Sequence, residues 1–180
     1  MEFTAAGILQ GVPFIPSPNF DERPADAMID LIVVHGISLP PGEFGGDGVE
    51  QLFTNSLDYD AHPYFQTLRE MRVSAHFFVR RDGRCIQFVP CSKRAWHAGV
   101  SSWQGRERCN DFSIGIELEG SDEVPYEPAQ YESLSQLVAL LRREYPVREV
   151  VGHSDIAPGR KTDPGPSFEW TLLRSLLQNA

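Results

Sequence analysis

Short apolar runs alternate along this chain with segments of helical periodicity, and that order restricts the folds open to it. Four segments have the pattern of buried or half-buried strands: 29–35, 73–90, 111–120 and 147–153. Within the second of these, Asp82-Gly83 favours a tight turn, so we expect a hairpin there. The sequence therefore predicts several strands that are not all joined by hairpins.

Helical patterns lie between and after these strands. Residues 129–145 place apolar side chains on one helical face, with Pro128 at the start and Pro146 just beyond the end. Three further helices are expected at 48–57, 62–71 and 168–178. Strands interleaved with helices, together with a hairpin, indicate a mixed α/β fold, a central mixed β-sheet flanked by helices.

The 180 residues suit a single domain, 1–180, with an irregular, proline-rich arm over residues 1–28 packed on it. No apolar run approaches the roughly 18 residues of a membrane span, and we see no basic and apolar leader. We therefore expect a cytoplasmic protein without a membrane partner, and a monomer. A net charge of −9 argues against nucleic-acid binding.

Three cysteines are present, Cys85, Cys91 and Cys109. Their odd number, and the lack of a C-x-x-C pair, favours reduced thiols in a reducing compartment. A Cys85–Cys91 bridge is the alternative.

Two histidines stand at the ends of apolar strands. His35 follows the run 29–34, His153 follows the run 147–152, and Asp163 comes ten residues later. A histidine in such a place is often only a satisfied core residue. Two imidazoles and a carboxylate brought to one sheet edge would nevertheless suit a borderline ion such as zinc.

The strand at 111–120 carries two acidic residues. Alternation places Gly115, Glu117 and Glu119 together on the face opposite Ile114 and Ile116. That face is either solvated or lines a cleft, and alternation alone does not separate the two glutamates.

Four longer motifs carry a resemblance: "VVHGISLPPGEFGG", "VSAHFFVRRDG", "RAWHAGVSSWQGRERCNDFSIGIELEG" and "GHSDIAPGRKTDPGP". They resemble the AmpD-type 1,6-anhydro-N-acetylmuramyl-L-alanine amidases. This group belongs to the type 2 amidases, with the phage amidase lysozymes and the peptidoglycan-recognition proteins. The likeness runs from about Ser17 to Trp170 and implies a mixed sheet with a zinc site at one edge.

The resemblance implies one Zn²⁺ per chain, held by His35, His153 and Asp163, with Glu117 and Lys161 as catalytic residues. The implied reaction is hydrolysis of the amide between the lactyl group of anhydro-N-acetylmuramic acid and L-alanine. The implied role is peptidoglycan recycling, which limits β-lactamase induction. An anhydromuropeptide is then the expected partner.

Four more residues match positions expected near the substrate. Arg72 and Arg108 are implied to meet stem-peptide carboxylates, which arginine pairs well, although surface ion pairing is the alternative. Trp96 could present an apolar face to the sugar or simply pack in the core. His97 could instead orient a metal ligand from behind.

One departure from the resemblance stands beside a ligand. Gly36 occupies a position where asparagine is more usual, which puts any substrate contact of that asparagine in doubt. Two other functions stay open. One is a muropeptide-binding module that does not cut, and the other is a structural zinc, which requires a fourth protein ligand such as Cys109 or His97.

Overall fold

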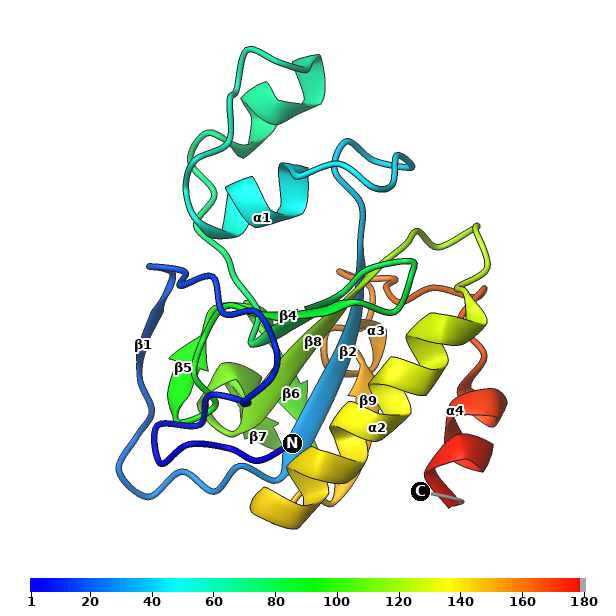
Figure 1. Ribbon diagram of the computed structural model, residues 1–180. Helices are drawn as coiled ribbons and strands as arrows, with labels where there is room; N and C mark the ends of the chain where they lie inside the picture. The colour runs from blue at the N-terminus through cyan, green and yellow to red at the C-terminus, as the bar shows by residue number, and fades with distance from the viewer. Residues whose placement is uncertain (179–180) are drawn as a thin grey trace.

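A five-stranded mixed sheet forms the centre of the computed structural model, which describes residues 1–178 (Figure 1). Its strands, in spatial order, are β4 (Cys85–Gln87), β3 (Phe77–Val79), β8 (Ser113–Glu119), β2 (Leu31–Ile37) and β9 (Glu149–Gly152). The strands β3, β8, β2 and β9 run parallel, and β4 pairs antiparallel with β3 through the expected hairpin. The mixed fold predicted from the sequence is confirmed.

One face of the sheet is covered by α2 (Pro128–Glu144) and α4 (Trp170–Gln178), which lie beside each other in Figure 1. Alternate residues of β2 and β8 point to this face and are fully buried, among them Ile32, Val34, Ile114 and Ile116. The apolar stripe of α2 packs on them, and burial of this kind is the main stabilising term of such a layer.

The remaining elements lie on the other face or around the sheet. They are β1 (Phe20–Glu22), α1 (Gly48–Phe53), the 3₁₀ helix η1 (Pro63–Leu68), β5 (Lys93–Ala95), β6 (Ser102–Trp103), β7 (Arg106–Glu107), the 3₁₀ helix η2 (Cys109–Asp111) and α3 (His153–Ile156). In Figure 1, α1 stands above the carboxyl end of β2. A second apolar cluster joins α1 and η1 to the outer face of the hairpin.

Among the expected boundaries, the strand ends at His35 and His153 are wrong. The strand β2 does not end at His35 but continues to Ile37, because its parallel pairing with β8 extends to Ile37 opposite Glu119. His153 does not close the last strand, because β9 ends at Gly152 and His153 is the first residue of α3.

The three cysteines are free thiols, so the Cys85–Cys91 bridge does not form. Burial raises the pKa of Cys85 to about 12, which keeps that thiol protonated and unreactive. None of the helices within residues 1–178 combines the length and the apolar character that a membrane crossing requires.

Candidate metal centre

Three side chains from separate elements converge at the carboxyl ends of the parallel strands. His35 comes from β2, His153 from the start of α3, and Asp163 from the loop that follows α3. The distance between the two histidine Nδ1 atoms is 3.0 Å, and Asp163 Oδ2 lies 3.0 Å from His153 Nδ1 and 3.4 Å from His35 Nδ1. All three ligand atoms fall within 4.8 Å of one another, so one ion could contact them all.

The protonation of this cluster suits a metal. Burial lowers the pKa of His35 to about 4, which keeps the imidazole neutral and able to donate a lone pair. Burial acts to raise the pKa of Asp163, but hydrogen bonds with His153 and His35 hold it below its usual range. Two imidazoles and one carboxylate are a donor set of catalytic zinc sites, so the residues present fit the ion.

His35 is held from behind by a chain of polar groups. Its Nε2 lies 2.9 Å from His97 Nδ1, and His97 Nε2 lies 3.2 Å from the hydroxyl of Ser113. That hydroxyl donates to the carbonyl of Cys109 at 2.6 Å. If Nδ1 of His35 faces the metal position, its Nε2–H donates to His97 Nδ1, and His97 Nε2–H donates to the hydroxyl of Ser113. These hydrogen bonds fix the orientation of the His35 ring.

Glu117 and Glu119 are both buried, yet only one of them faces the cluster. Glu117 pairs with His35 in the strand register, and its Oε1 lies 3.9 Å from His35 Nδ1. Its Oε2 has no hydrogen-bond partner within residues 1–178. The carboxylate of Glu119 instead accepts the backbone N–H groups of Gly45 and Arg81.

The environment of Glu117 makes it a strong proton acceptor. Burial raises its pKa well above the usual range, the nearby charge of Asp163 adds to the rise, and Lys161 opposes it. A buried carboxylate with a free oxygen and a raised pKa, beside a metal position, is the arrangement expected of a general base.

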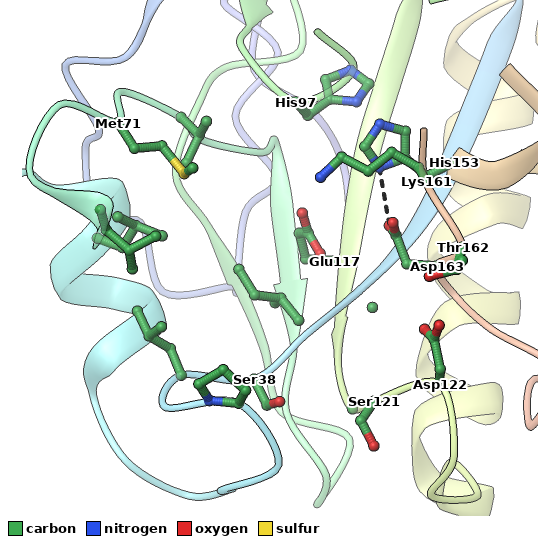
Figure 2. A pocket seen from close by; sticks show the side chains of 18 of the residues that line it. Ser38, Met71, His97, Glu117, Ser121, Asp122, His153, Lys161, Thr162 and Asp163 are labelled. Carbon is green, nitrogen blue, oxygen red and sulfur yellow. Dashed lines mark hydrogen bonds and ion pairs between the residues drawn. The ribbon is translucent and has the colours of Figure 1, made fainter. Parts of the chain in front are cut away.

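A cavity of about 540 Å³ opens in front of these groups (Figure 2). His97, Glu117, His153, Lys161 and Asp163 line its polar side. Figure 2 shows Lys161 reaching into the same space as Glu117, with Met71 on the opposite side. That opposite side is apolar and comes largely from α1, η1 and the chain around them: Leu39, Leu52, Phe53, Leu68 and Met71.

The other residues expected near a substrate lie farther out. Neither Trp96 nor Arg72 lines the cavity, and the Arg72 guanidinium donates to the carbonyls of Arg69 and Met71. Arg108 faces Asp111 at 3.3 Å and lines a separate surface hollow, which adjoins the cavity through Arg160.

A fourth protein ligand is not in place within residues 1–178. The cluster that could hold an ion contains three members, and His97 contacts the nitrogen of His35 that faces away from it. Cys109 does not join the cluster either, so the arrangement differs from a closed structural zinc site.

Two residues that support the centre were not singled out from the sequence, Ser113 and Tyr126. Alternation places Ser113 on the same face of β8 as Glu117, which is a usable signal. Tyr126 lies in a loop, and its hydroxyl donates to the carbonyl of Pro164 beside Asp163. Nothing local in the sequence reports such a contact.

Comparisons with known proteins agree with this geometry. Residues 25–166 match the N-acetylmuramoyl-L-alanine amidase family. The chain is 58% identical over 165 residues to the 1,6-anhydro-N-acetylmuramyl-L-alanine amidase AmpD of Citrobacter freundii, which covers 91% of this chain and 88% of that protein.

Two solved structures extend the match. A crystal structure of a selenomethionine AmpD derivative superposes with a TM-score of 0.94 at 56% identity, over 98% of this chain and 99% of that chain. The second structure is the Escherichia coli amidase AmiD in complex with anhydro-N-acetylmuramic acid-L-Ala-D-gamma-Glu-L-Lys. It superposes with a TM-score of 0.60 at 32% identity, over 88% of this chain and 65% of that chain. The chain belongs to the N-acetylmuramoyl-L-alanine amidase family and is an amidase of the AmpD type.

Proposed function

We propose that this chain is a zinc-dependent amidase that hydrolyses the bond between the lactyl group of anhydro-N-acetylmuramic acid and L-alanine. The observation that carries the proposal is the convergence of His35 Nδ1, His153 Nδ1 and Asp163 Oδ2 at the edge of the cavity that His153, Asp163 and Glu117 line. The Oε2 of Glu117 has no hydrogen-bond partner within residues 1–178. His35, His153 and Asp163 would hold the zinc ion. When bound, zinc supplies Lewis acidity at this point of the cavity and makes an attacking water more acidic.

Glu117 is the proposed proton carrier. Glu117 lines the cavity, and its buried Oε2 has no hydrogen-bond partner within residues 1–178, so the carboxylate can accept a proton from the attacking water and then deliver it to the leaving amine of L-alanine. The raised pKa of Glu117 supports both halves of this transfer, because a stronger base takes the proton more readily and the resulting acid is still able to release it.

Lys161 is the proposed partner of the developing negative charge on the amide oxygen. The loop from Ala157 to Pro166 places it in the cavity, and its backbone N–H donates to Ala157 at 3.0 Å. Loss of one such donor lowers turnover by ~10²–10³-fold in comparable sites. The apolar wall around Met71 would exclude bulk water from this side of the reacting bond.

The names of the relatives support the substrate class. The AmpD of Citrobacter freundii is named for the anhydro-N-acetylmuramyl-L-alanine bond, and AmiD was solved with an anhydro-muramyl tripeptide. A cavity with one polar and one apolar wall suits an amphiphilic sugar–peptide junction. We place the reaction in cytoplasmic peptidoglycan recycling, where removal of muropeptides limits β-lactamase induction.

The direct test is incubation with anhydromuramyl tripeptide, with the products followed by mass spectrometry. Zinc-loaded protein should release the free tripeptide and the intact anhydro sugar. Metal-free protein should release neither until zinc is restored. Binding of the muropeptide without cleavage by the zinc-loaded protein would overturn the amidase proposal in favour of a binding module.

A further inference from the structure

The hydroxyl of Tyr126 lies beside the metal position, in the space that a side chain at position 36 would fill. We call this space the Tyr126 slot. Gly36 follows His35 on β2, and a Cβ atom built on it would lie 2.2 Å from the hydroxyl oxygen of Tyr126. The backbone of Gly36 is not in the left-handed region, so its conformation does not demand glycine. A side chain at this position would therefore require the tyrosine hydroxyl to move.

The ring of Tyr126 is confined on a second side as well. A Cβ atom on Gly120 would lie 2.3 Å from the ring atom Cε1, and the Tyr126 residue is 6% exposed. Its ring also contacts Phe168, with the centroids 5.5 Å apart. Two glycines and an aromatic neighbour therefore fix where the hydroxyl can be.

The hydroxyl donates to the carbonyl of Pro164 at 2.9 Å. This is the residue directly after Asp163, and within residues 1–178 no other donor contacts that carbonyl. On the other side, the carbonyl of Asp163 itself accepts the N–H of Ser154 at 3.0 Å. The backbone that carries the Asp163 carboxylate is thus held at two successive carbonyls, one of them by Tyr126 alone.

We infer that Tyr126 is a positioning residue for the carboxylate ligand Asp163, and that Gly36 is the space which this tyrosine requires. The inference rests on the proposed function, since it assigns Tyr126 a part in forming the zinc site. Tyr126 does not line the cavity and is not one of the three residues that could hold an ion, so the proposed role is exerted through Asp163. A side chain at position 36 would displace the hydroxyl, because its Cβ would lie 2.2 Å from the oxygen.

Tyr126→Phe removes the hydroxyl and keeps the ring, so it is the first test. Mutation of an outer hydrogen-bond partner of a metal ligand typically lowers metal affinity by ~10–100-fold. We expect zinc affinity, measured by competition with a chromogenic chelator, to fall about 10-fold by that rule. The visible spectrum of the cobalt-substituted protein should also change, because it reports the arrangement of the ligands.

Tyr131→Phe is the matched control. Tyr131 belongs to the same aromatic cluster, and its hydroxyl also bonds the backbone, accepting the N–H of Glu169 at 2.7 Å. Its loss should lower the melting temperature without altering zinc affinity or the cobalt spectrum. Equal effects of Tyr126→Phe and Tyr131→Phe on the metal would show a general loss of stability and overturn the inference.

Gly36→Ala tests the slot from the other side. It should lower zinc affinity in the wild-type background, where its Cβ meets the hydroxyl. In the Tyr126→Phe background it should have little further effect, because the ring carbon that carried the hydroxyl would lie 3.5 Å from the new Cβ. Fully additive losses would contradict a shared slot.

The failures of the two proposals are distinguishable. If Tyr126→Phe binds zinc and cobalt as the wild type does, Tyr126 has no positioning role and the zinc amidase proposal is untouched. If the wild-type chain binds no zinc, the proposed function fails and this inference fails with it.

Discussion

Glu117 and Glu119 lie two residues apart on β8 with their side chains on the same sheet face, yet their surroundings differ completely. Glu117 lines the cavity and has a buried oxygen with no hydrogen-bond partner within residues 1–178, whereas Glu119 accepts two backbone N–H groups, from Gly45 and Arg81. Alternation along the strand predicted the shared face correctly. It could not separate the two residues, because the difference comes from loops that are distant in sequence.

This difference predicts opposite results for one substitution. Glu117→Gln should bind zinc normally and lose ~10²–10⁴-fold in kcat, the usual contribution of a positioned general base. Glu119→Gln should keep its turnover and lose about 1–3 kcal/mol of unfolding free energy, the effect of a poorly satisfied buried group. Steady-state kinetics and urea unfolding on both variants test this, and an active Glu117→Gln contradicts the assignment.

His76 supplies a pH prediction at the same scale. Its Nδ1 accepts the N–H of Gly115, and its Nε2 lies 3.0 Å from the carbonyl of Lys93. Burial, aided by the charge of Arg23, lowers the pKa of His76 to about 3. An unfolded histidine titrates near 6.5, so below that pH the unfolded state takes up a proton that the folded state does not. The stability from a neutral His76 is complete above pH 6.5 and is lost progressively as pH falls to about 3.

His76→Gln keeps an acceptor and a donor but cannot titrate. Between pH 7 and pH 5 the wild type should lose about 2 kcal/mol more unfolding free energy than the variant, at 1.36 kcal/mol per pH unit below 6.5. Denaturant unfolding at the two pH values measures this difference. Parallel losses in the two proteins would show that His76 does not carry the effect.

At the scale of the elements, pairing between strands decides where the site residues lie. The register places His35 directly opposite Glu117, which no segment of the sequence reveals by itself. The same pairing extends β2 past His35 to Ile37, although Gly36 and the prolines that follow predicted an earlier end. Local patterns found these strands, and tertiary pairing set their limits.

A substitution at Gly115 tests whether β8 and His97 hold the metal centre in place. A Cβ atom on this glycine would lie 2.4 Å from the ring of His97, the residue behind His35. Gly115→Ala should therefore displace His97 and lower zinc affinity by ~10–100-fold, as for other outer partners. Gly46→Ala, where a Cβ atom meets nothing within 4 Å, is the control that should leave zinc binding unchanged. A folded Gly115→Ala protein with wild-type zinc affinity would contradict the role of His97.

At the scale of the whole molecule, the sheet separates a packing face from a reactive face. The helices α2 and α4 bury one side, and the cavity opens on the other between the strand ends and α1. The order of strands and helices in the sequence predicted the mixed fold, because each periodicity is local. The Tyr126 slot could not be predicted, since it depends on how the loop of Tyr126 packs against β2 and against the loop of Pro164.

The hollow that Arg108 lines adjoins the cavity through Arg160, so a long substrate could extend from one to the other. Arg108 is well exposed, and an exposed ion pair contributes up to ~1 kcal/mol. Arg108→Ala should then raise KM about fivefold for a substrate with a charged stem peptide, with kcat unchanged. A substrate trimmed to L-alanine should be unaffected, and an equal rise in KM for both would count against a stem contact.

The central claim is that His35, His153 and Asp163 together bind one zinc ion. Calorimetric titration of zinc into the metal-free wild type and into Asp163→Asn tests it most directly, because asparagine keeps the shape of the side chain and removes its charge. We expect one zinc per chain for the wild type, and a loss of affinity in the variant greater than the roughly 100-fold upper effect of an outer partner. Equal stoichiometry and affinity in the two proteins would contradict the account.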